Sequence, residues 1–94
     1  MTDARPDTLT ILVVRSGGFA GLSREWRVRS VDHPEVDWAR LVEACPWRSV
    51  AADPASRDRF VYRITVSAPR RRATVPEGAL TGPWKALVDR VRSA

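Results

Sequence analysis

Residues 9–31, LTILVVRSGGFAGLSREWRVRSV, contain the pattern that decides the fold. Their first part, Leu9 to Arg15, is apolar and β-branched, which is typical of a strand and compatible with burial on both faces. The last part, Leu22 to Val31, alternates between apolar and polar side chains, as a half-buried strand does. The glycines between the two parts supply positive φ at low cost, so the stretch predicts an antiparallel hairpin with residues 16–21 as its connection.

A second hairpin is expected nearer the C-terminus. Residues 60–66 alternate, with apolar side chains at the even positions and mostly polar ones at the odd positions. Residues 68–71, APRR, are expected to form its turn, and residues 72–75 to begin the fourth strand. Residues 47–58 show no sustained period and are predicted to form a long loop, a kind of segment that often carries function.

Two helices are predicted from capping signals and helical spacing. The first begins at Asp32, the expected N-cap, with Glu35 placed to complete a capping box. It ends before Pro46, because proline disfavours the helical conformation of the residue that precedes it. The second begins at Gly82 and Pro83, with proline in the first helical position. The apolar stripes at helical spacing are Trp38, Leu41, Val42 and Cys45 in the first helix and Trp84, Leu87, Val88 and Val91 in the second.

The fold class that follows is α+β, with the element order β-β-α-β-β-α. Two hairpins in one four-stranded antiparallel sheet, with both helices packed on one face, give every apolar stripe a partner. We expect residues 1–7 to be a disordered tail and residues 8–94 to form a single domain. The predicted core contains Trp26, Trp38, Phe60, Tyr62, Ile64, Trp84 and Leu87.

Length and composition limit the classes of protein to which the chain can belong. Its 94 residues weigh 10.5 kDa, enough for one domain, and 44% of them are apolar, enough for one modest core. No apolar run approaches the ~20 residues that a membrane-spanning helix needs. The N-terminus lacks the basic flank and apolar stretch of a secretory signal, so we expect a cytoplasmic location.

Few side chains are available for catalysis or metal binding. The chain has one cysteine, Cys45, and one histidine, His33. This composition excludes a disulfide scaffold, a zinc finger and a histidine-based catalytic triad. We therefore expect no cofactor, no metal site and no enzymatic activity, although composition leaves a carboxylate-only mechanism open. Cys45 lies on the apolar stripe of the first helix and is expected to be a small core residue rather than a nucleophile.

The chain is strongly basic. Its 16 lysine and arginine residues against 11 aspartate and glutamate residues give a net charge of +5 and a pI near 10.9. All of the basic residues except Lys85 are arginine. A charge of this sign favours an acidic protein or nucleic acid as partner. The alternative is a solvated basic surface without a partner, since charged side chains mostly face water.

Several motifs, taken in order, resemble one protein family. An apolar strand ending in Arg15 is followed by residues 16–21, SGGFAG, and later by residues 58–66, DRFVYRITV. Between them residues 41–44, LVEA, lie on a predicted helix, and an apolar helix closes the chain. In this order and spacing the motifs resemble the emfourin family (protealysin inhibitors), small bacterial proteins that inhibit thermolysin-like M4 metallopeptidases. The resemblance covers residues 8–92.

The resemblance implies a protease inhibitor that binds one M4 metallopeptidase in a 1:1 complex and occludes its active-site cleft. It implies neither a membrane partner nor a small-molecule substrate. The sequence departs from the family's pattern in residues 46–57 and at the arginines of residues 70–72. Because recognition residues often lie on loops, the first of these departures affects the expected site. The candidate protease-binding residues are Gly17, Gly18, Phe19, Ala20 and Gly21 in the first connection, Trp47 and Val50 in the long loop, and Asp58 at its end.

The candidates have different expected roles. Phe19, Trp47 and Val50 are included because thermolysin-like enzymes, as the resemblance implies, favour bulky apolar side chains just after the scissile bond. Asp58 or Asp53 offers a carboxylate that could approach the protease zinc. A structural role for Phe19, in which its ring caps the core and the glycines only permit the turn, remains an alternative, since large aromatic side chains are usually buried.

A small basic nucleic-acid-binding module is the main alternative function. Arg27, Arg29 and Arg63 share the polar face of the predicted sheet, and the arginines of residues 70–72 add to them, so this face could contact phosphates. Aromatic side chains for base stacking are not expected there, because those of residues 60–66 share the apolar register. Nucleic acid is therefore the less favoured partner. An accessory subunit without a defined site is a third possibility.

Overall fold

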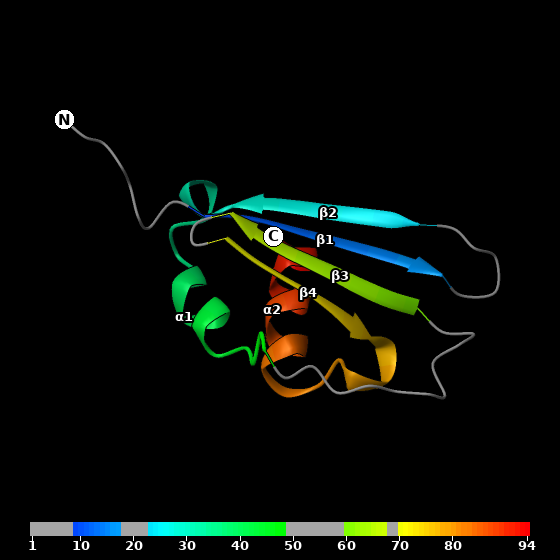
Figure 1. Cartoon of the computed structure of the whole chain (residues 1–94). Coiled ribbons are helices and arrows are strands. Elements are labelled where there is room, and N and C mark those ends of the chain that lie inside the picture. Colours follow the sequence, from blue (N-terminus) through cyan, green and yellow to red (C-terminus); the bar gives the residue numbers. More distant parts are fainter. Residues whose placement is uncertain (1–8, 18–22, 49–59, 68–69) are drawn as a thin grey trace.

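A four-stranded antiparallel sheet forms the frame of the protein (Figure 1). The computed structural model describes residues 9–17, 23–48, 60–67 and 70–94. The strands are β1 (Thr10–Gly17), β2 (Arg24–Arg29), β3 (Phe60–Ser67) and β4 (Arg70–Pro76), and their order in the sheet is β2-β1-β3-β4. The two most apolar strands, β1 and β3, therefore occupy the centre. The arginine-rich β2 and β4 form the edges, where charged side chains discourage pairing with another chain.

Both helices lie on the same face of the sheet (Figure 1). The helix α1 (Trp38–Glu43) comes after β2 and the 3-10 turn Ser30–Asp32. The helix α2 (Gly82–Ser93) comes after β4 and the 3-10 turn Glu77–Ala79. The α+β class, the element order and the antiparallel sheet confirm the predicted fold.

Alternate residues of each strand form the apolar side of the sheet. In the register, Ile11 of β1 lies between Val28 of β2 and Val66 of β3. Apolar side chains of both helices cover this side, as their helical spacing predicts. The buried core consists of Leu9, Ile11, Val13, Val28, Trp38, Val42, Cys45, Tyr62, Ile64, Val66, Ala73, Val75, Trp84, Leu87, Val88 and Val91.

Most of the predicted core is confirmed. The predicted residues that are buried are Trp38, Tyr62, Ile64, Trp84 and Leu87. The other two, Trp26 and Phe60, are only half-buried: they pack against the core, and arginine side chains lie on their rings. Leu12 and Val14, on the opposite face of β1, are also half-buried, so complete burial of this strand on both faces is wrong.

The first helix begins later than predicted. Its N-cap is Asp37, whose Oδ1 accepts a hydrogen bond from the Arg40 amide at 3.2 Å. Asp32 lies in the 3-10 turn instead, so the predicted capping box is wrong. The reason is Pro34, which disfavours helical backbone at His33. His33 accordingly has φ −137° and ψ 66°, outside the helical region.

Strand β4 begins at Arg70, so the arginines that were predicted to form the second turn belong to the sheet. Arg70 and Arg72 point to the helix-free side by alternation. Arg71 points to the helix side, where its Nη2 pairs with Glu43 Oε2 of α1 at 3.2 Å. The basic segment is therefore split between the two faces of the sheet.

Some predictions concern residues outside the described ranges. The predicted tail, residues 1–7, lies there, and so does most of the predicted long loop, from residue 49 onward. The tail and the single-domain boundary at residue 8 therefore stay predictions.

Inside the described ranges, β2 is shorter than predicted, since it ends at Arg29, where the 3-10 turn begins. The helix α2 starts as predicted, with Pro83 in its first turn.

Candidate functional site

The two connections that are predicted to contact a protease adjoin neighbouring points of the sheet. Gly17, the last residue of β1, is the register partner of Phe60, the first residue of β3. Residues 18–22 continue from Gly17, and residues 49–59 precede Phe60. Gly17 has φ 92°, a conformation that favours glycine and explains this residue at the end of the strand. The Phe60 amide donates to Glu77 Oε1 at 3.1 Å, which ties this point of the sheet to the turn after β4.

Trp47 is the other predicted site residue that the structure describes, and it is half-buried. Its indole N–H donates to the Val42 carbonyl at 2.7 Å, and its ring meets Trp84 edge-on with 4.8 Å between the centroids. Trp47 therefore holds the end of α1 against α2, and only the exposed part of its ring is free for a partner. The predicted site residues outside the described ranges are Gly18, Phe19, Ala20, Gly21, Val50 and Asp58.

A cluster of arginine and aromatic side chains beside the Gly17–Phe60 pair was not predicted. This arginine–aromatic cluster consists of Arg15, Arg24, Trp26, Phe60 and Arg92. The guanidinium carbon of Arg15 lies 4.2 Å from the ring centroid of Phe60 and 5.5 Å from that of Trp26. The guanidinium carbons of Arg24 and Arg92 lie 5.4 Å and 5.0 Å from the Trp26 centroid. Cation–π attraction at these distances favours fixed positions of the guanidinium groups.

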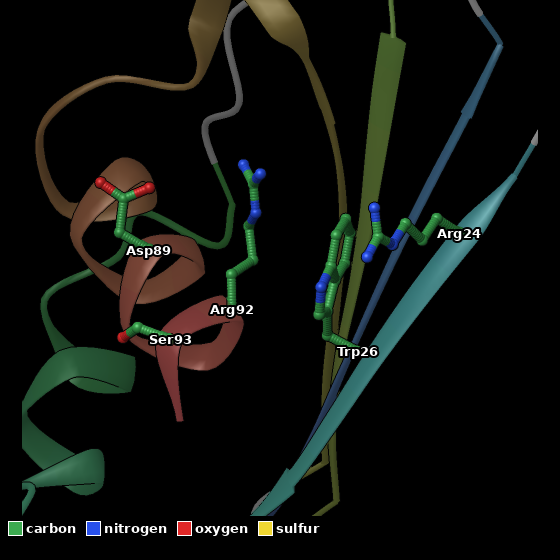
Figure 2. A pocket seen from close by; sticks show the side chains of 5 residues that line it. All are labelled: Arg24, Trp26, Asp89, Arg92 and Ser93. Carbon is green, nitrogen blue, oxygen red and sulfur yellow. The ribbon is translucent and has the colours of Figure 1, made fainter.

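Figure 2 shows the open side of this cluster. The Trp26 ring stands between Arg24 of β2 and Arg92 of α2, at a pocket of about 450 Å³. Asp89 also lines the pocket, but Lys85 Nζ engages its carboxylate at 2.7 Å. In the part of the chain that the structure describes, none of the cluster's arginines forms an ion pair with a carboxylate. The cluster therefore offers guanidinium groups to an acidic partner, whose carboxylates match the guanidinium fork.

One feature of the sequence could have indicated this cluster. Arg15 and Arg24 are register partners on the helix side of the sheet, where alternation places mostly apolar residues. Trp26 and Phe60 pack against the core and carry guanidinium groups on their rings, but both stay half-buried, so their assignment to the core was right only in part. Partly exposed tryptophan with arginine is a combination typical of binding hot spots.

The thiol and the imidazole of the chain are used within the fold. Cys45 is buried, as predicted, with its Sγ 3.4 Å from the Leu41 carbonyl oxygen and 3.5 Å from that of Pro83. Burial raises the pKa of Cys45 to about 11, so the thiol stays protonated at neutral pH. His33 Nδ1 lies 3.8 Å from a carboxylate oxygen of Glu35. Within the described ranges, no group of three or more His, Cys, Asp or Glu side chains could hold a metal ion.

The buried thiol leads to a prediction about pH. Because folding raises the pKa of Cys45, the native state keeps the proton longer than the unfolded state, and stability falls as pH rises from about 9 to about 11. A shift of this size corresponds to about 2–3 kcal/mol, which is fully present below pH ~9 and lost above pH ~11. Urea unfolding of the wild type and of Cys45→Ala, at neutral pH and at about pH 10.5, should show the larger loss in the wild type. Equal losses in the two proteins would contradict this role of the thiol.

Comparison with known proteins gives a family match. The model of the Emfourin family matches residues 13–92, which extend from β1 to the last turn of α2 and include both connections and the arginine–aromatic cluster. No curated protein and no solved structure matches the chain significantly. Neither of the helices in the described ranges has the length and apolar character needed to cross a membrane.

Proposed function

The chain belongs to the Emfourin family, whose members inhibit metalloproteases, and on this premise we propose that it inhibits an M4, thermolysin-like zinc metallopeptidase. One copy binds one protease molecule and covers the entrance to the active-site cleft, so that substrate is kept out. The protein needs no cofactor for this role and catalyses no reaction of its own. The protease that it meets is a bacterial enzyme of the cytoplasm.

The register of β1 against β3 is the observation that carries the proposal beyond the family. It places Gly17 beside Phe60, so the connection of residues 18–22 and the segment of residues 49–59 adjoin the same end of the two central strands. Loops positioned by a rigid scaffold are a common means of recognition. Two connections that leave from one end of the sheet can enter one cleft, which supports their joint action on the protease.

The arginine–aromatic cluster supports the same location. Tryptophan and arginine are enriched among the residues that contribute most to binding. An acidic side chain of the protease at Arg24 or at Arg92 would form charge-assisted hydrogen bonds beside the Trp26 ring. These bonds gain strength when the complex excludes water. We therefore include the cluster in the proposed interface, together with the two connections.

The surface of the molecule is large enough for such an interface. Its accessible area is 6281 Å², and a standard interface of ~800 Å² per partner would use about one-eighth of it. Nanomolar affinity corresponds to ~12 kcal/mol, while one buried apolar side chain contributes only ~1.5–3 kcal/mol. A single anchor residue is therefore not sufficient, and the proposed interface combines two connections with the cluster.

Titration of the purified protein into a thermolysin-like M4 protease, with a short peptide substrate, tests the proposal. We expect activity to fall to an end point at one inhibitor per enzyme, because each complex removes one active site. Mass spectrometry of the inhibitor after the titration should show an intact chain, which distinguishes an inhibitor from a slowly cleaved substrate. Full activity of several M4 proteases in a large excess of the protein would contradict the proposal.

Arg24→Ala tests whether the cluster takes part. Loss of a charge-assisted hydrogen bond at the interface should weaken inhibition about 10- to 100-fold. The thermal midpoint should stay constant, because Arg24 is exposed. The matched control is Arg90→Ala, which removes an exposed arginine of α2 outside the cluster and should inhibit like the wild type. Equal inhibition constants for both variants would remove the cluster from the interface, whereas the titration decides on the inhibitory function itself.

A further inference from the structure

The helix-free face of the sheet is strongly basic. Glu25 is the acidic residue that alternation places on this face among the described strands, and it stands against five arginines. The face therefore carries an excess of four positive charges, compared with +5 for the whole chain. The arginines, all of them exposed, are Arg27, Arg29, Arg63, Arg70 and Arg72.

Acidic residues are segregated from this face. Those in the described ranges other than Glu25 lie in the helices or in the turns and segments beside them: Asp32, Glu35, Asp37, Glu43, Glu77 and Asp89. No carboxylate in the described part of the chain forms an ion pair with any of the five arginines. A surface that only confers solubility can intersperse both signs. The segregation therefore points to an anionic partner.

The register places most of these arginines along the two edges of the sheet. Two rows that cross it from β2 to β4 are Arg29, Thr10, Ser67 and Arg70, and then Arg27, Leu12, Thr65 and Arg72. The edge strands are three strand spacings apart, about 14 Å. Uncharged side chains lie between the arginines, and all of them except Leu12 carry a hydroxyl group. Two of the hydroxyl residues and two of the arginines line a hollow of about 380 Å³. Guanidinium and hydroxyl groups are the ones that proteins commonly use to bind phosphate oxygens.

We propose that this face binds double-stranded nucleic acid through its phosphates, independently of base sequence. The separation of the edge strands is close to the ~12 Å width of a major groove, so arginines from both edges reach phosphates that border one groove. The described part of this face contains no aromatic side chain, because Trp26, Phe60 and Tyr62 lie on the helix side. Single-strand binding and protein hot spots rely on aromatic side chains. A duplex is therefore favoured over a single strand or a second protein.

This face is separate from the proposed protease site. The rows that contain Thr10 and Leu12 lie seven and five residues from Gly17 along β1, about 23 Å and about 17 Å at the rise of a strand. The arginine–aromatic cluster lies on the opposite, helix-covered side of the sheet. Duplex binding thus does not depend on protease inhibition, and each is tested without the other.

Fluorescence anisotropy with a labelled DNA duplex of about 20 base pairs tests the inference between about 50 and 200 mM NaCl. Four phosphate contacts predict that the logarithm of the association constant falls with the logarithm of the salt concentration with a slope of about −3.6. The association constant should therefore decrease about 150-fold over this range.

Arg27→Gln/Arg72→Gln removes two contacts and should reduce the slope to about −1.8. The control Arg40→Gln/Arg90→Gln makes the same change in net charge on the helices and should keep the steep slope. Arg27→Lys/Arg72→Lys keeps the charge and should retain most of the binding, which separates lost contacts from misfolding.

Several results would overturn the inference. The first is the absence of duplex binding at the lowest salt concentration. The second is an equal loss of duplex affinity in the two double glutamine variants. The third is tighter binding of a single strand of the same length than of the duplex. Binding of anionic phospholipid vesicles through the same arginines, without duplex binding, would assign the face to a membrane surface instead. A steep salt slope for duplex binding that is lost in Arg27→Gln/Arg72→Gln and kept in Arg40→Gln/Arg90→Gln would support duplex binding by this face.

Discussion

Trp84→Ala is expected to lower the free energy of unfolding by about 3–5 kcal/mol. Trp84 is only 4% exposed and fills the junction between α2 and the end of α1, where its ring meets that of Trp47. Truncation leaves a cavity that its neighbours fill only in part, and Trp47 loses its aromatic partner. Each kcal/mol moves the midpoint of a domain of this size by roughly 4–8 °C, so the thermal midpoint should fall by roughly 12–40 °C.

Thermal and urea unfolding followed by circular dichroism measure this effect without relying on the fluorescence of the removed ring. The matched control is Lys85→Ala, at the next position of α2. Lys85 is exposed and pairs with Asp89 at 2.7 Å, and an exposed pair of this kind contributes at most about 1 kcal/mol. Its midpoint should therefore stay near that of the wild type. A Trp84 variant that unfolds within a few degrees of the wild type would show that the core does not depend on this junction.

The strands could be predicted because each side chain's face follows from its position alone. In β3 the side chains of Tyr62, Ile64 and Val66 are buried and that of Arg63 is exposed, as the alternation predicts. The same reasoning gave the stripe of α2, from Trp84 to Val91, which is buried. The observed burial agrees with these patterns, because burial of the apolar face is the dominant stabilising contribution in a sheet that is covered on one side.

The start of α1 could not be found from capping signals alone. Asp32 was predicted to be the N-cap because Glu35 could complete a capping box with it, whereas the residue that caps the helix is Asp37. The restriction that Pro34 imposes on His33 prevents a helix from starting at Asp32, because a residue before proline avoids helical backbone. The same rule predicted that the helix ends before Pro46, and α1 does so, although it ends at Glu43 and not at Cys45. Local conformational restriction therefore outweighed a favourable capping pattern.

The location of the candidate site depends on pairings between distant strands. Alternation assigns a residue to a face, but it does not say which strand lies beside it or what covers that face. The neighbouring positions of Gly17 and Phe60 follow from the pairing of β1 with β3, which the sequence left open. Trp26 lies on the apolar side of the sheet, as its alternation predicts, but there it belongs to the partly exposed arginine–aromatic cluster. Arg24, the register partner of Arg15 on this side of the sheet, is the residue that could have indicated the cluster.

Phe19→Ala is expected to weaken inhibition by about 1.5–3 kcal/mol, roughly 10- to 150-fold, without a change in the thermal midpoint. The expectation comes from a bulky apolar side chain in the connection that follows Gly17, although Phe19 itself lies outside the described residues. Both quantities need to be measured on the same samples, because loss of a core phenylalanine would cost about 3–5 kcal/mol of stability. A collapsed midpoint would assign Phe19 to the core and transfer the anchor to the second connection.

The second connection offers Val50 and Trp47, and they are not equivalent as tests. Trp47→Ala should lower the midpoint, since its indole bonds to the Val42 carbonyl and packs on Trp84. Val50→Ala is therefore the more direct test of an anchor there, provided that its midpoint stays constant. Inhibition that weakens in step with stability, in any of these variants, would indicate a folding effect rather than a lost contact.

Val31→Ala is the matched control for the loss of an apolar side chain. Val31 is 56% exposed and lies next to Ser30, whose amide donates to the Leu9 carbonyl just before β1, at the opposite end of the strand from Gly17. Its truncation should leave inhibition unchanged, because the proposed interface adjoins the end of the sheet at which Gly17 and Phe60 lie. Weaker inhibition in the Phe19 variant alone would place the protease at that end of the sheet. Equal inhibition by folded variants at positions 19, 50 and 31 would remove both connections from the interface and leave the arginine–aromatic cluster as the remaining candidate.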